Sequence, residues 1–362
     1  VRRRLTPSLT MAGHGKRGPS VQPLCRYIQM SHARRVPHET AVQTAIHTCW
    51  PAAADLWEEN LEPARAEFAA FCTLMAQGGQ ALVIHAATAE AEASARKAMG
   101  KDVKILRNPY GDVWARDTGP VFAVEGGKLL AIRFRFNGWG GKYALDGDQQ
   151  IGLAIAASAG AQLREVDLVC EGGALEFDGE GSVITTRQCL LNANRNPSLT
   201  EAQVEDRLKE ALGLQQVIWL DEGLIGDHTD GHVDNIARFI APGIVACQEA
   251  SGSDDPNAEI YDAIARQLES ATDAKGRKLK IVRIPSPGLV ADEEGEPKAA
   301  SHMNWVIGPK NVVVPAYNDR AQAAVTALKP YFAGRALAAS PSLHILSGGG
   351  AFHCVTCNQP LV

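Results

Sequence analysis

Long apolar runs are absent from this 362-residue sequence. No stretch approaches the ~18 consecutive apolar residues that a membrane-spanning helix needs, which argues against an integral membrane protein. Hydrophobic residues make up 45% of the chain and charged residues 21%, a balance typical of a globular protein with a sizeable core. The length alone allows one large domain or two to three smaller ones.

Acidic residues are missing from the first 35 positions, which hold eight basic residues. Such a segment is typical of an organellar targeting peptide or of a nucleic-acid-binding arm. Because no apolar periodicity runs through it, we interpret residues 1–35 as an unstructured extension, or as a start assigned too early with Met30 as the true beginning. Residues 36–362 would then form a single catalytic domain. With 28 of the 36 basic and all 41 acidic residues, that domain carries a formal −13, which favours a cationic small substrate and disfavours nucleic acid.

A second cysteine pair and a secretory signal are also lacking. The eight cysteines are scattered, mostly in apolar segments such as "EFAAFCTLM", so we expect a reduced, cytoplasmic protein. Cys354 and Cys357 have the spacing of a zinc or redox pair, but zinc needs about four ligands and no second pair completes the set. We therefore expect no metal at this pair and disfavour a dithiol redox role.

A ββαβ pattern recurs through the chain. Each cycle has a hairpin with a Gly- or Pro-containing turn, a helical stretch, and a short apolar run that we interpret as a strand. The hairpins are 116–137, 171–186, 230–250 and 301–318; the helices are 149–163, 199–213, 257–271 and 319–332; the final runs are 165–170, 215–220, 279–285 and 343–347. Ser198 and Glu201 have capping-box spacing before the second helix.

A fifth unit must be assembled from both ends of the chain. Residues 351–360 and 40–51 would supply its hairpin, residues 61–77 its helix and residues 81–85 its last strand. Recurrence of this kind indicates radial repetition, and a ring closed by pairing the termini leaves no free sheet edge. The sequence therefore predicts an α/β fold, a five-bladed pseudo-symmetric ββαβ propeller.

Polar residues gather at one phase of the repeat, the turn that opens each first strand. They are Asp117, Glu171, His232, Asp234, Asn304 and Cys354. Each has an ordinary structural explanation when taken singly, such as a packed thiol, a hydrogen-bonded histidine or an ion pair between Arg116 and Asp117. Together they predict one pocket in which a thiolate attacks an electrophilic carbon while a histidine moves protons. Carboxylates beside a thiol raise its pKa unless a cation neutralises them, so we expect a cationic substrate, and a guanidinium matches paired carboxylates best.

Six ordered motifs carry a resemblance to a known family. They are "NPYGDVWARDTGPVF", "FNGWGGKY", "EGGALEFDGEGSVITT", "LLNANRNP", "GDHTDGHVDNIARF" and "GGGAFHCVTCNQP". Together they resemble the agmatine deiminase and bacterial-type (Porphyromonas-type) peptidylarginine deiminase family of the pentein superfamily, over roughly residues 36–362. The resemblance implies a five-bladed α/β propeller and a cofactor-free hydrolysis that releases ammonia.

By match of motif, the resemblance also implies roles for individual residues. Cys354 would be the nucleophile that forms a thiouronium intermediate, and His232 the acid/base residue oriented by Glu171. Asp117 and Asp234 would grip the guanidinium, and Trp114 would form the pocket wall. The glycines before Cys354 would let its loop move over the substrate.

The chain departs from the family pattern in several places. Ala351 and Phe352 replace a common Asn-Ile pair, and Cys357 and Asn358 stand where glutamines are usual. The motifs around residues 302–305 and 36–51 are also altered. These positions surround the part of the pocket that would read the far end of the substrate.

The substrate expectation follows from these observations. The leading prediction is hydrolysis of agmatine to N-carbamoylputrescine and ammonia, a step of putrescine biosynthesis. The alternatives are a deiminase acting on free or peptidyl arginine or another guanidine, and, more distantly, a non-catalytic pentein binding protein. We expect no nucleic-acid or membrane partner, and the sequence leaves a homo-oligomer open.

Overall fold

The computed structural model of this protein describes residues 33–362. The extension predicted for residues 1–35 lies outside these residues except for its last three, so its interpretation stays a prediction. At its end, Arg34 forms an ion pair with Glu125 (3.1 Å) and Arg35 bridges to Val124. Arg34 and Arg35 therefore contact the folded chain.

Four ββαβ units run through the middle of the chain, as predicted. In each, two antiparallel strands form a hairpin and a helix leads to a third strand parallel to the second. The units are β4 (Val121–Glu125), β5 (Lys128–Arg135), α6 (Asp148–Ser158) and β6 (Gln162–Val169); β7 (Glu176–Phe177), β8 (Ser182–Thr186), α8 (Glu201–Leu212) and β9 (Gln216–Leu220); β10 (Ala237–Ala241), β11 (Ile244–Glu249), α9 (Ala258–Ser270) and β12 (Lys280–Pro285); β13 (Val306–Ile307), β14 (Asn311–Ala316), α10 (Ala321–Leu328) and β15 (Ala336–Pro341).

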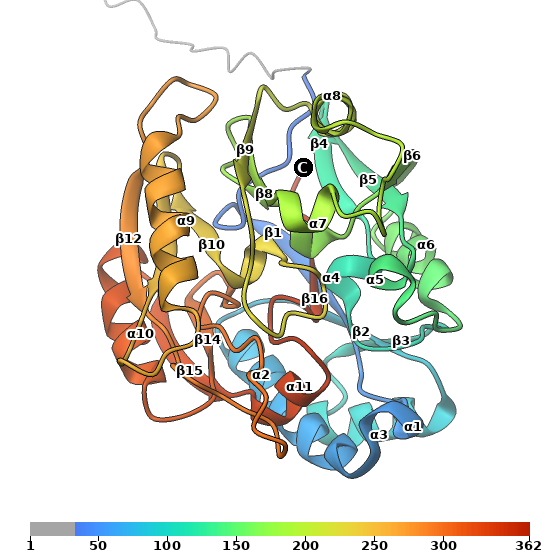
Figure 1. Ribbon diagram of the computed structural model, residues 1–362. Helices are drawn as coiled ribbons and strands as arrows, with labels where there is room; N and C mark the ends of the chain where they lie inside the picture. Colours follow the sequence, from blue (N-terminus) through green and yellow to red (C-terminus); the bar gives the residue numbers. More distant parts are fainter. Residues whose placement is uncertain (1–32) are drawn as a thin grey trace, which may run out of the picture. The chain divides into compact units, whose positions relative to one another are not determined.

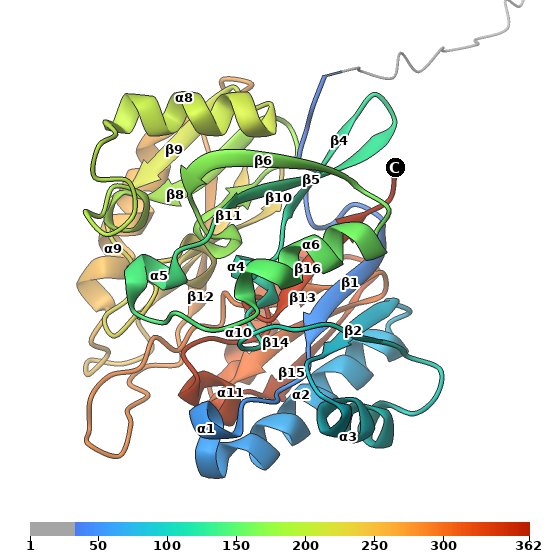
Figure 2. The ribbon, with the colours of Figure 1, turned by 90° about the vertical axis from the view of Figure 1, so that its right-hand side faces the viewer.

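The fifth sheet joins the two ends of the described chain. Strand β16 (Thr356–Pro360) pairs antiparallel with β1 (Gln43–Cys49), which confirms the predicted closure of the ring. Helix α2 (Leu61–Gln77) and strand β2 (Leu82–Ala86) complete the unit. The unit also carries a helix and strand that the sequence interpretation did not include, α3 (Ala89–Met99) and β3 (Lys104–Arg107). The long helices lie around the outside of the sheets (Figures 1 and 2).

Two local predictions were wrong. The run 343–347 forms helix α11 (Leu343–Ser347) rather than the last strand of its unit, which is β15. The carboxylate of Glu67 accepts the backbone N–H groups of Leu343, His344 and Ile345 at 2.9–3.1 Å, so a distant side chain caps the helix. The capping box of α8 is Thr200 with Gln203, because the helix begins at Glu201 itself.

Short helical turns lie where the hairpins open, and they position the polar residues. Three of them directly precede a first strand: α4 (Ala115–Thr118) before β4, η2 (Gly172–Ala174) before β7 and η3 (Val233–Asn235) before β10. The others are α1 (Ala54–Trp57), η1 (Glu58–Asn60), α5 (Gly138–Gly141), α7 (Arg187–Leu190) and η4 (Lys329–Tyr331). None of the helices between residues 33 and 362 has the length and apolar character needed to cross a membrane.

Candidate active site

The six polar residues predicted for the site come from all five units, and all are buried. Asp117 lies on α4, Glu171 precedes η2, His232 and Asp234 flank the start of η3, and Cys354 precedes β16. His232 Nδ1 lies 3.8 Å from Asp117 Oδ1, and His232 Nε2 lies 3.8 Å from Glu171 Oε2. Cys354 Sγ lies 3.7 Å from Asp234 Oδ2. The structure therefore brings the predicted polar residues together.

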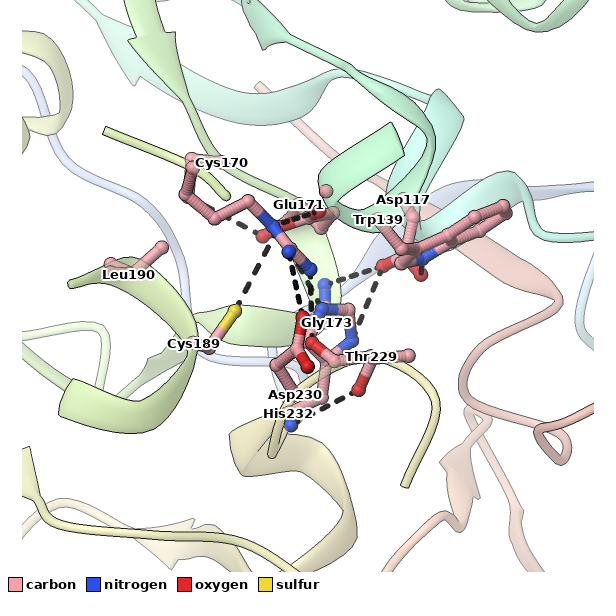
Figure 3. A network of polar contacts seen from close by, with 12 residues as sticks. Asp117, Trp139, Cys170, Glu171, Gly173, Cys189, Leu190, Thr229, Asp230 and His232 are labelled. Atoms are coloured by element: carbon pink, nitrogen blue, oxygen red, sulfur yellow. Dashed lines mark hydrogen bonds and ion pairs between the residues drawn. The ribbon is translucent and has the colours of Figure 1, made fainter. Parts of the chain in front are cut away.

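Asp117 is held in one orientation by two donors. Its Oδ1 accepts the backbone N–H of Gly173, and its Oδ2 accepts the indole N–H of Trp139, both at 2.9 Å (Figure 3). A Cβ on Gly173 would lie 2.6 Å from His232 Nδ1, so this close approach requires glycine. Burial, and next Asp234 and Glu171, raise the pKa of Asp117 against the opposing effect of His232. The site thus concentrates negative charge that a cation would neutralise.

His232 is a buried imidazole with open nitrogens. Among the residues that the structure describes, neither ring nitrogen has a hydrogen-bond partner, since the 3.8 Å separations are too long. Burial lowers the pKa of His232, but Asp117, Cys189 and Glu171 outweigh it and raise the pKa well above its usual value. The ring is therefore protonated near neutral pH and can donate a proton to a reacting group.

Glu171 is neutralised by a buried arginine that the sequence interpretation did not single out. Arg195 Nε donates to Glu171 Oε1 at 2.7 Å, and its guanidinium also reaches Asp230 at 2.9 Å and the carbonyl of Thr229 at 3.0 Å. Although burial opposes ionisation, His232 and Arg195 lower the pKa of Glu171. Arg195 lies inside the motif "LLNANRNP", which is the signal that could have identified it.

Three of these side chains have the spacing of a metal site. The ligand atoms of Glu171, Cys189 and His232 all lie within 4.8 Å of one another, and the Cys189 thiol approaches Glu171 Oε2 at 3.9 Å (Figure 3). The guanidinium of Arg195 already bonds this carboxylate, so a second cation there would face a fixed positive charge. Cys354 and Cys357 do not belong to the group, and Cys357 Sγ instead donates to Pro120 O at 3.3 Å.

Asn304 holds the thiol of Cys354. Its Nδ2 donates to Cys354 Sγ at 3.2 Å, while its Oδ1 accepts the backbone N–H groups of His353 (2.8 Å) and Cys354 (3.3 Å). Burial, followed by Asp234 and Asp117, raises the pKa of the Cys354 thiol well above its usual value. A cation bound beside it would favour the thiolate.

A cavity of about 200 Å³ gives access to the thiol. It is lined by Leu56, Trp57, Asp112, Trp114, Asp117, Trp139, Tyr143, Leu145, His228, Thr229, Ser347, Gly348, Gly349 and Cys354. The lining contains no lysine or arginine, and its carboxylates are Asp112 and Asp117. The indoles of Trp57 and Trp114 stack with ring centroids 6.2 Å apart, and Trp57 Nε1 donates to Asp112 at 2.8 Å.

The glycines before Cys354 have a packing role. A Cβ on Gly348 would lie 2.7 Å from the Trp57 ring, and one on Gly350 would lie 2.6 Å from Trp114. Side chains at these positions would push the indoles away from the cavity wall. Movement of this loop over a substrate stays a prediction.

Comparisons with known proteins agree on one family. Residues 35–360 match the family described as Porphyromonas-type peptidyl-arginine deiminase. The agmatine deiminase of Pseudomonas aeruginosa (strain LESB58) is 35% identical over 351 residues, covering 90% of this chain and 95% of that protein. The solved agmatine deiminase of Enterococcus faecalis is 28% identical with a TM-score of 0.86, covering 91% of this chain and 96% of that one. A cysteine-to-serine variant of C. jejuni agmatine deiminase, solved with substrate bound, is 27% identical with a TM-score of 0.82, covering 90% of this chain and 96% of that one.

Proposed function

Since the chain belongs to the Porphyromonas-type peptidyl-arginine deiminase family and is a hydrolase of the agmatine deiminase kind, we propose a specific reaction for it. We propose that it hydrolyses agmatine to N-carbamoylputrescine and ammonia. The observation that carries the choice of substrate is the charge of the cavity lining, which has two carboxylates and no lysine or arginine. Agmatine and arginine share the guanidinium, but arginine also carries a carboxylate. That group would find no lysine or arginine in the lining and would meet carboxylates instead.

Asp112 is the residue we assign to the far end of agmatine. Its carboxylate lines the same cavity as Asp117 and is oriented by the indole N–H of Trp57. Burial raises the pKa of Asp112 to about 6, so a bound ammonium group would favour its ionised form. The two carboxylates then match the two cationic ends of a diamine-like guanidine.

The reaction begins with the guanidinium between Asp117 and Asp234. Asp234 Oδ2 is bonded by His353, while its Oδ1 is buried and unpartnered in the described part of the chain, so it is free to accept a guanidinium N–H. The substrate charge offsets the carboxylates around Cys354 and allows the thiol proton to leave to solvent. The Cys354 thiolate then forms a bond to the guanidinium carbon, which becomes tetrahedral.

His232 moves the protons in both halves of the reaction. As an imidazolium it donates a proton to one amino group of the adduct, which leaves as ammonia and produces a thiouronium on Cys354. The neutral ring then takes a proton from water as the water oxygen attacks the same carbon. Breakage of the C–S bond, with loss of the remaining hydroxyl proton to solvent, releases N-carbamoylputrescine and returns the thiolate. Glu171, fixed by Arg195, orients the ring throughout.

A panel of guanidines tests this proposal. Purified protein is incubated with agmatine, free arginine and a blocked peptidyl-arginine, and ammonia release and the ureido product are measured, with Cys354→Ser as the blank. We expect kcat/KM for agmatine to exceed that for arginine by at least a hundredfold. A higher kcat/KM for arginine or the peptide would contradict agmatine as the substrate. If none of the three compounds released ammonia, the proposed reaction itself would be wrong.

Asp112→Asn tests the far end of the substrate separately. The change removes the charge but keeps the size and the acceptor for Trp57. We expect KM for agmatine to rise at least tenfold with kcat within about threefold, because Asp112 lies away from the reacting carbon. An unchanged KM would remove Asp112 from substrate recognition.

A further inference from the structure

Glu39 lies in the segment before β1, and its carboxylate reaches residues of three other segments near Cys354. Its side chain is 16% exposed and makes three ionic contacts. Glu39 Oε1 lies 3.0 Å from Arg116 Nη2 and 2.9 Å from His353 Nε2, and Glu39 Oε2 lies 2.6 Å from Arg238 Nη2. The residue therefore connects the N-terminal segment to the residue that immediately precedes Cys354.

His353 lies between two carboxylates. Its Nε2 faces Glu39 Oε1, and its Nδ1 faces Asp234 Oδ2 at 2.7 Å. Burial opposes ionisation of Glu39, but His353, Arg238 and Arg116 hold its pKa well below the usual value; His353 likewise lowers the pKa of buried Asp234. Ionised carboxylates only accept hydrogen bonds, so both ring nitrogens must donate. A ring that donates from both nitrogens is an imidazolium.

The position of this imidazolium is fixed on every side. Asn304 accepts the backbone N–H of His353, and Arg116 Nε donates to its carbonyl at 3.3 Å. The charged and titratable groups around the imidazole are Asp234 on η3, Glu39, Glu176 on β7, Arg116 on α4, Arg238 on β10 and the adjoining Cys354. Without Glu39, Nε2 would lose its carboxylate acceptor, and only Nδ1 would still donate, to Asp234.

We propose that Glu39 is a positioning residue that keeps His353 as an imidazolium, and that this cation offsets the Asp234 carboxylate 3.7 Å from the Cys354 thiol. Among the charged groups, Asp234 raises the pKa of the Cys354 thiol most and so disfavours the thiolate. A cation bonded to Asp234 Oδ2, the oxygen nearest the thiol, reduces that effect and leaves Asp234 Oδ1 unpartnered among the described residues and free to accept from the substrate. The inference rests on the proposed role of Cys354 as nucleophile but not on agmatine as substrate.

The charge of the ring is measured directly. Protein with ¹⁵N-labelled histidine is examined by NMR at pH 7, and the His353 signals are assigned by their loss in His353→Gln. We expect both ring nitrogens of His353 to be protonated in the wild type and one of them to be unprotonated in Glu39→Gln. A neutral His353 ring in the wild type overturns the proposal without any variant.

The effect on the thiol is measured with iodoacetamide, which is neutral and does not depend on guanidinium binding. The rate of Cys354 alkylation is followed from pH 6 to 10 by mass spectrometry of its peptide. The alkylation rate rises with pH as the thiol ionises, and for Glu39→Gln we expect this rise to occur at least one pH unit higher than in the wild type. At a pH below the rise in both proteins, the variant should therefore be alkylated about tenfold more slowly. Turnover should fall similarly at neutral pH and recover at alkaline pH.

Glu176→Gln is the matched control. Glu176 pairs with the same Arg238 at 2.8 Å and is more deeply buried than Glu39, and no hydrogen bond or ion pair among the described residues joins it to His353. Burial raises its pKa to about 7, so Glu176 is ionised over most of the pH range of the alkylation, and glutamine at this position removes a partner of Arg238 but no hydrogen-bond acceptor of His353; we expect the pH at which alkylation rises to stay within 0.3 pH unit. Glu39→Asp keeps the charge and should restore most of the rate. If the pH at which alkylation rises moved equally in Glu39→Gln and Glu176→Gln, the role of Glu39 would be structural only. If it moved in neither variant, the inference would be refuted.

Discussion

Asp117→Asn separates a role in guanidinium binding from a role in packing. The change keeps the size and can still accept the Gly173 N–H, but it removes the charge and places an amide donor against the indole donor of Trp139. Breaking a buried charge pair on one side typically costs ~3–5 kcal/mol. At ~1.4 kcal/mol per decade, kcat/KM for agmatine should fall by about two to four decades.

The same variant should alter the pH dependence of activity. Asp117 raises the pKa of His232 more than any other group does, so removal of its charge should lower that pKa. The protonated ring is the acid in the proposed reaction, and the basic limb of kcat should therefore move to lower pH. Steady-state kinetics from pH 5.5 to 9.5 measure both effects, and thermal unfolding checks the fold. We expect the melting temperature to be unchanged or higher, because a buried charge is removed. A loss below tenfold with an unmoved basic limb would refute the placement of Asp117 in the site.

Three further predictions concern the nucleophile, stability and metals. Cys354→Ser should abolish turnover but not folding, and 2-chloroacetamidine should label the wild type once, at Cys354, with protection by agmatine; labelling mainly at Cys357 would contradict the assignment. Burial lowers the pKa of His85 to about 3 and of His302 to about 4, so both are neutral when folded. Below pH ~6.5 only the unfolded state takes up these protons, so the free energy of unfolding measured in urea should be lower at pH 5 than at pH 7 by about 2 kcal/mol per histidine. The decrease should be smaller in His302→Asn. A free energy of unfolding that is the same at both pH values would exclude the effect. Activity should be unaffected by EDTA, and stoichiometric zinc that is lost together with activity would overturn the thiolate mechanism.

The repeat was predictable because its signals are local. Turn residues such as the glycines before Lys128 and Pro242–Gly243 form hairpins from neighbouring sequence, and helices such as α9 show their apolar face directly. Equivalent turns then bring Asp117, Glu171 and His232 together. The ring closure followed from the same logic, since a sheet without its edge partner would be incomplete.

The interactions that the sequence did not reveal join residues distant in the chain. Glu67 caps α11 from 276 to 278 positions away, which turned a run that resembles a strand into a helix. Glu39 and His353 are 314 positions apart, and Arg195 reaches Glu171 across the 24 positions that contain the hairpin of β7 and β8. Such pairs depend on the three-dimensional arrangement, and no local pattern of spacing indicates them.

The charges around Cys354 explain why the site needs its own substrate to become reactive. Burial, Asp234 and Asp117 raise the pKa of the thiol, while Asp117, Cys189 and Glu171 raise the pKa of His232 and keep it protonated. A thiol and an imidazolium are the wrong partners for a nucleophile activated by its own histidine, because the ring cannot accept the thiol proton. They are the right partners when a guanidinium supplies the missing positive charge, since it favours the thiolate and leaves His232 ready to protonate the departing amino group. Neutral amides lack that charge, so the site should not hydrolyse them even when they fit the cavity.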